Sequence, residues 1–172
     1  MTTPVTAAAA AMRGLASRVL EPGPCRPSKF LFDVETEYAK NDADDLLIRV
    51  TIHNRADEAA FVAALPTLWF RNLWSFGLAN EKPLMYLKKI PNGYGEVKAI
   101  HYEAGEYHFY FDRPQRTLFT ENETNTERLY GVPNKTPFVK DAFHHAVIKN
   151  DFEWIENKSE GTKFAPHYEF NI

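Results

Sequence analysis

Apolar and polar residues alternate with a period of two along most of the chain, which predicts strands. In residues 30–38, aromatic and aliphatic side chains alternate with acidic ones, as is typical of a half-buried strand. Residues 46–52 show the clearest alternation, with four aliphatic side chains on one face. A polar turn at residues 41–44 separates the two segments. We therefore expect an antiparallel hairpin.

Further segments also have β-type patterns. Residues 61–70 are apolar on both faces, so we expect their outer side to be covered, and Pro66 places this segment at a sheet edge or a bulge. Residues 97–102 and 107–111 flank a turn that contains glycine, and they predict a second hairpin. Its inner face is expected to hold Tyr107, Phe109 and Phe111. Residues 117–121 predict a short strand, and residues 164–172 alternate to the end.

Helical signals are few. Residues 140–148 predict a brief helix, followed by a polar loop at residues 150–162. The aromatic content of 14% favours strands over helices. We expect an all-β, mainly antiparallel fold: a β-sandwich with short helical insertions in one domain of residues 29–172. The final strand has neither a turn nor a return partner after it, so we expect this sandwich to be incomplete.

Residues 1–28 differ from the rest of the chain. They hold an alanine run at residues 7–11, Arg13 and Arg18, and no acid before Glu21, a composition weakly similar to an organelle transit peptide. Three prolines between residues 22 and 27 separate this segment from the first strand. A disordered or foreign leader is the preferred interpretation. The localisation stays unknown on this basis, with the cytoplasm favoured and organelle targeting as the alternative.

Composition excludes several classes of function. There are 20 Lys and Arg against 23 Asp and Glu, and no basic run that would follow a phosphate backbone, so nucleic acid is not expected as a partner. Cys25 is the single cysteine, so neither an internal disulfide nor a cysteine metal site is expected. The six histidines lack the spacing of metal ligands. No apolar stretch has the length of a membrane span. We expect no metal, cofactor or membrane partner.

Two stretches, residues 65–77 and 119–134, combine aromatic residues, an arginine and uncharged hydrogen-bonding side chains, a mixture typical of ordered contact surfaces. With residues 137–141 after them, they closely resemble the amino-terminal region of bacterial-type glycoside hydrolase family 63 proteins, often described as mannosyl-oligosaccharide glucosidase-like. The similarity runs from about residue 29 to residue 168 without large gaps. The chain departs from the family pattern at Leu73 and Phe76, where Thr and Trp are expected, and at residues 142–146.

The resemblance implies a β-sandwich that precedes a catalytic (α/α)6 toroid. It also implies inverting α-glucosidase or related exo-glycosidase chemistry, carried by acidic residues of the toroid and not by these 172 residues. We therefore predict a non-catalytic domain that supports and docks onto the catalytic domain. Two alternatives are a free-standing carbohydrate-binding module and a small enzyme in its own right.

The candidate contact residues come from the two stretches. Glu121 and Glu123 resemble a catalytic pair, because residues two apart on a strand lie about 6.6 Å apart, but both would project the same way instead of flanking a substrate. We interpret them as carboxylates that accept hydrogen bonds. Trp69, Trp74 and Phe76 are a candidate sugar platform, with core or interface packing as the preferred interpretation. Planar donors that are expected to hold the partner domain are Arg71, Asn72, Asn125 and Arg128.

Overall fold

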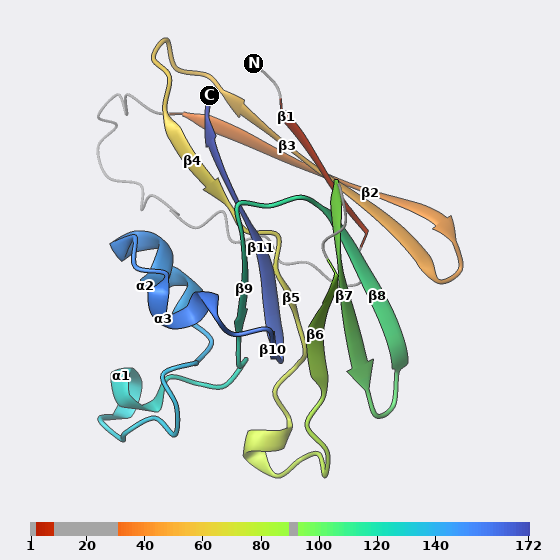
Figure 1. Ribbon diagram of the computed structural model, residues 1–172, viewed down its shortest axis with the longest axis vertical. Coiled ribbons are helices and arrows are strands. Elements are labelled where there is room, and N and C mark those ends of the chain that lie inside the picture. Colours follow the sequence, from red (N-terminus) through yellow and green to blue (C-terminus); the bar gives the residue numbers. More distant parts are fainter. Residues whose placement is uncertain (1–2, 9–30, 90–92) are drawn as a thin grey trace.

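The computed structural model describes residues 3–8, 31–89 and 93–172, which form two antiparallel sheets with short helices beside them (Figure 1). This confirms the predicted all-β, mainly antiparallel fold. The large sheet has seven strands, in the order β10 (Glu160–Gly161), β6 (Leu84–Lys89), β7 (Tyr94–His101), β8 (Gly105–Asp112), β1 (Thr3–Ala8), β3 (Asp45–Asn54) and β2 (Phe32–Asp42). Both predicted hairpins, β2 with β3 and β7 with β8, are present.

The small sheet is built around the last strand, β11 (Lys163–Asn171). One of its edges pairs with β4 (Phe61–Ala64) and β5 (Leu68–Trp69), and the other pairs with β9 (Arg116–Thr120). The pairs Lys163 with Trp69 and Tyr168 with Ala64 keep one register, so β4 and β5 are two parts of one edge strand. The interruption contains Pro66, which has no N–H for the ladder. The final strand therefore has partners on both edges.

A hydrophobic core fills the space between the two sheets, as in a β-sandwich. Its centre is Phe164 of β11, whose ring lies 4.7 Å from that of Phe119 and 5.1 Å from that of Phe111. The remaining buried members are Ile48, Leu68, Met85, Val97, Ala99 and Phe109. Because these residues come from both sheets, the core joins the predicted hairpins to the small sheet.

Helices cover the other face of the small sheet (Figure 1). They are α2 (Ala142–Lys149) and α3 (Glu153–Glu156). The short helix α1 (Thr126–Tyr130) has no buried residue, and a 3-10 turn, η1 (Trp74–Phe76), precedes β6. A second core lies beneath α2 and α3, where Leu118 of β9 and Ala165 of β11 meet Phe143 of α2 and Ile155 of α3. The small sheet is therefore buried on both faces, and the predicted helix at residues 140–148 matches α2 within two residues.

Several sequence predictions are corrected. The polar loop expected at residues 150–162 contains α3, β10 and the buried side chains of Phe152 and Ile155, which close the second core. The strand expected to be half-buried, β2, is exposed along nearly its whole length, because it lies at the edge of the seven-stranded sheet. Tyr107 is also exposed, whereas Phe109 and Phe111 are buried as predicted.

Besides α3, which lies in the expected loop, the elements without a counterpart in the sequence predictions are β6, η1, α1 and β10. Within the range assigned to a leader, residues 3–8 form β1, which pairs with β3 and β8. The other residues of the 1–28 range, including Cys25, lie outside the described residues.

Candidate functional site

The two stretches singled out in the sequence lie against each other in the fold. The indole Nε1 of Trp74 donates a 2.8 Å hydrogen bond to Oε1 of Glu123. Nδ2 of Asn122 donates one of 2.8 Å to the carbonyl of Phe70. These bonds connect the segment after β5 to the segment after β9, about fifty residues further along the chain. The fold places both segments side by side because β5 and β9 pair with the first residues of β11, on opposite edges of that strand.

Lysines neutralise the acidic pair. Nζ of Lys82 lies 3.1 Å from Oε2 of Glu121 and 3.1 Å from Oε1 of Glu123. Glu121 also lies 3.3 Å from Nζ of Lys158 and accepts a 2.9 Å hydrogen bond from the Thr162 hydroxyl. Burial alone would raise the pKa of Glu123, but the hydrogen bonds from Trp74 and Lys82 outweigh it and the pKa is lowered. Glu123 is thus held as a carboxylate, and both acidic side chains share Lys82 as an ion-pair partner.

A hydrogen-bond network organises α1. Oδ1 of Asn125 accepts from the backbone N–H of Arg128 at 3.0 Å, as a helix N-cap does, and also from Nδ2 of Asn134 at 2.9 Å. Nδ2 of Asn125 donates to Asp141, and Nη1 of Arg128 lies 3.0 Å from Oδ2 of the same carboxylate. Burial would raise the pKa of Asp141, but Arg128 and Asn125 hold it below its usual value. Asn125 and Arg128 therefore anchor their own loop to the start of α2.

The remaining predicted residues are separate from these networks. Arg71 is exposed and forms no hydrogen bond or ion pair within the described part of the chain. Asn72 exchanges hydrogen bonds with Ser75, one of them 2.6 Å long, and so shapes the entry to η1. In residues 31–89 and 93–172, no ring contact joins Trp69, Trp74 and the exposed Phe76.

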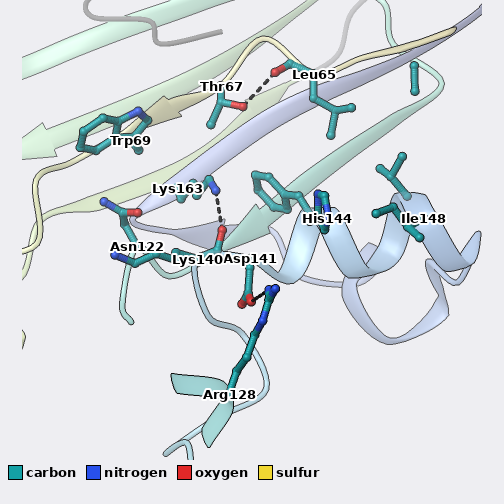
Figure 2. Close-up of a pocket in the computed structure, with 13 residues that line it drawn as sticks. Leu65, Thr67, Trp69, Asn122, Arg128, Lys140, Asp141, His144, Ile148 and Lys163 are labelled. Carbon is teal, nitrogen blue, oxygen red and sulfur yellow. Dashed lines mark hydrogen bonds and ion pairs between the residues drawn. The ribbon is translucent and has the colours of Figure 1, made fainter. Parts of the chain in front are cut away.

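A pocket of about 620 Å³ lies between the outer side of β4 and β5 and the helix α2 (Figure 2). Two of the predicted contact residues, Trp69 and Arg128, line it, together with Asn122. Sequence reasoning missed Lys163, which projects from β11 between Trp69 and α2 (Figure 2). In the sequence, Lys163 lies on the same strand face as Ala165 and His167. The period-two pattern alone predicts that this face is exposed to solvent, so it gives no sign of a pocket.

The Lys163 ammonium has a strongly lowered pKa. Its Nζ donates a 2.5 Å hydrogen bond to the carbonyl of Lys140 and lies 5.0 Å from the centre of the Phe143 ring. Burial, followed by the positive charge of Lys140, lowers the pKa of the Lys163 ammonium to about 8. Asp141 acts in the opposite direction. The pocket thus combines a shielded ammonium with apolar and aromatic walls.

Nowhere in the described ranges do three or more His, Cys, Asp or Glu side chains gather as a metal site would require. No helix in those ranges has the length and apolarity to span a bilayer.

Comparison with known proteins gives one curated relative. The chain is 27% identical over 164 aligned positions to the uncharacterized protein YMR196W of Saccharomyces cerevisiae. The alignment covers 81% of this chain but only 15% of the yeast protein, so the chain spans a small part of that relative's length. No protein-family model matches the sequence, and no solved structure matches the chain.

Proposed function

We propose that this chain is a non-catalytic β-sandwich domain of a glycoside hydrolase family 63-like α-glucosidase or exo-glycosidase, which supports and docks onto a catalytic (α/α)6 domain. The state of the acidic pair supports a non-catalytic role. A glycosidase general acid needs a raised pKa and a partner carboxyl across the scissile bond. Glu123 instead has a lowered pKa, and Lys82 bridges it to Glu121.

The observation that carries the docking proposal is the surface of α1 and the residues after it. Leu129, Tyr130 and Val132 are 60%, 71% and 56% exposed, although the Asn125 network holds their backbone in place. Contiguous apolar side chains on an ordered loop are typical of protein contact surfaces. We call these three residues the α1 patch. It belongs to the second stretch that carries the family resemblance.

The length of the yeast relative is consistent with a larger neighbour. Since the aligned region is 15% of that protein, most of its chain is available to form a separate domain. A sandwich joined to such a domain would need a fixed contact surface, because flexible interdomain contacts are small and polar.

The docking test uses the yeast protein, produced as two polypeptides: the segment aligned with this chain and the remainder. We expect the two to bind, as measured by calorimetry. Replacing the residue aligned with Tyr130 by serine should weaken binding about tenfold or more, since a buried aromatic anchor dominates such interfaces. The same change at the residue aligned with Tyr38, an exposed tyrosine on β2, is the matched control. Absence of binding, or equal losses in both variants, contradicts docking through the α1 patch.

The catalytic test uses the 172-residue chain alone with a nitrophenyl α-glucoside. We expect no hydrolysis above the blank. Hydrolysis that disappears in Glu121→Gln or Glu123→Gln would instead identify a small enzyme and overturn the proposal.

A second candidate function, a carbohydrate-binding module, rests on the pocket. Trp69 and the side-chain amide of Asn122 line it together, and an aromatic face beside planar hydrogen-bonding groups suits a sugar ring. This function predicts saturable quenching of tryptophan fluorescence by glucose, maltose or mannose oligosaccharides. The response should disappear in Trp69→Phe and persist in Trp74→Phe. No response to any of these sugars would remove this candidate.

A further inference from the structure

The ammonium of Lys163 has no acidic partner. Of its three N–H groups, one donates to the carbonyl of Lys140, and no carboxylate forms an ion pair with it in the described ranges. The nearest acid that influences it, Asp141, already binds Arg128 and Asn125. Two N–H donors of a shielded cation are therefore left for another acceptor.

The charges around the pocket leave an excess of positive charge. Lys140, Lys163 and Arg128 line it together with a single acid, Asp141. The Arg128 and Asp141 charges offset each other at 3.0 Å, which leaves two lysines. Burial and the repulsion from Lys140 lower the pKa of Lys163, yet a value of about 8 leaves its amine mostly protonated at neutral pH. An anion placed here would relieve both the desolvation and the repulsion.

The other residues that line the pocket are mostly apolar, apart from Thr67, Asn122 and His144. Leu65 lies on the strand side and Ile148 of α2 on the helix side (Figure 2). Phe143 and Val147 of α2 also line the pocket. Trp69 closes the end near Asn122 (Figure 2). A volume of about 620 Å³ falls within the range of small-molecule sites. The apolar walls favour a ligand with a hydrocarbon or aryl body, because hydroxyl groups placed against these side chains would lose their water without gaining partners.

We propose that this pocket binds a small monocarboxylate with an apolar or aromatic body, its carboxylate accepting hydrogen bonds from Lys163 and its body lying between Leu65 and the α2 side chains. Lys140 is exposed, so Lys163 is the one shielded ammonium of the pocket, and it matches one negative charge. A phosphate dianion would need further donors to offset its larger desolvation. This inference is independent of docking through the α1 patch, which lies outside the pocket lining.

The binding test compares octanoate with octanol, and phenylacetate with phenylacetamide, on the whole chain at pH 7 by calorimetry. Each carboxylate should bind at least tenfold more tightly than its neutral partner, the size of effect expected of a charge-assisted hydrogen bond. Lys163→Met keeps the length and shape of the side chain and should remove this preference. Lys40→Met, which removes an exposed lysine of β2, is the control and should leave it unchanged. Equal affinity for the charged and neutral ligands, or a preference that survives in Lys163→Met, overturns the proposal.

A second measurement needs no variant, so it is decisive even if Lys163→Met fails to fold. Lysine side chains labelled with isotope are followed by NMR through a pH titration, with and without octanoate. Bound carboxylate should raise the pKa of one perturbed lysine, and octanol should not. Titration curves that are the same with octanoate, or binding of neutral sugars in place of carboxylates, would contradict the proposal.

Discussion

Trp74 and Glu123 are joined by a 2.8 Å hydrogen bond from the indole N–H to the carboxylate, across 49 residues of sequence. The bond ties the η1 loop to the segment after β9, and Lys82 completes it with an ion pair to the same carboxylate. Because both partners are partly shielded, the interaction fixes the geometry of two loops that have few buried apolar contacts of their own. It explains why the two stretches act as one surface.

Removing this acceptor should destabilise the domain. Glu123→Ala loses the Trp74 bond and the Lys82 ion pair, and we expect a loss of about 1 to 3 kcal/mol in the free energy of unfolding. Glu123→Gln keeps an oxygen acceptor for Trp74 and should lose less. Urea titration measures both, with the exposed Glu127→Ala as the control. Equal stability of Glu123→Ala and the control would show that the bond does not hold the loops.

The buried imidazole of His167 should make stability depend on pH. It lies against Phe152 with neither ring nitrogen hydrogen-bonded within the described residues. Burial lowers its pKa, Arg116 adds to this, and Glu169 opposes it. The folded chain therefore holds a neutral ring while the unfolded chain takes up a proton near pH 6.5. The contribution of this imidazole to the free energy of unfolding should be fully present above that pH. It should be lost as the pH falls through the lower pKa of the folded state.

His167→Leu should remove this part of the pH dependence. At pH 7 the variant should be at least as stable as the original chain, because an imidazole without hydrogen-bond partners is costly to bury. Denaturant titrations at pH 7 and 5.5 measure the change, and His144→Gln on the exposed face of α2 is the control. If the stability of His167→Leu depends on pH as strongly as that of the original chain, other titratable groups cause the pH dependence.

Gly95 should not tolerate a side chain. It pairs with Phe111 across β7 and β8, and a Cβ placed on it would come within 2.3 Å of the Phe111 ring. Gly95→Ala is therefore expected to cost about 1 to 3 kcal/mol through overpacking. The double variant Gly95→Ala with Phe111→Leu should lose less than the sum of the two single changes, since the smaller side chain makes room. Additive losses in urea titrations would argue against this contact.

Asn134 should control the order of α1. Its Oδ1 accepts from the N–H and hydroxyl of Thr126 and from the N–H of Glu127. A helix of five residues is not stable alone, so Asn134→Ala should open it locally. Amide exchange at residues 126–130 is expected to accelerate about tenfold, with little change in global unfolding. Thr136→Ala, an exposed neighbour, is the control. Exchange that is unchanged in Asn134→Ala would mean that Asn125 alone holds α1.

The sequence by itself determined the hairpins, the all-β class and the helix α2. Their signals are local: period-two alternation for β3 and β7, and an apolar stripe for α2 that buries Phe143 and Ala146. It also indicated that residues 65–77 and 119–134 each have the composition of an ordered contact surface, although not that the two stretches meet. The family resemblance and the docking role stay predictions.

Tertiary structure alone decided which faces are buried. Apolar alternation in β2 predicts burial, yet Val34 is 47% and Tyr38 52% exposed, because neither hydrophobic core of the described residues includes a residue of this strand. Residues 150–162 look polar, yet Phe152 and Ile155 close a second core because they lie over the small sheet. The helix α2 lies over the same face of the small sheet, so Lys163 of β11 lines a pocket and is not a fully exposed surface lysine. Local pattern sets the direction of a side chain, but only the packing of distant segments determines what it meets.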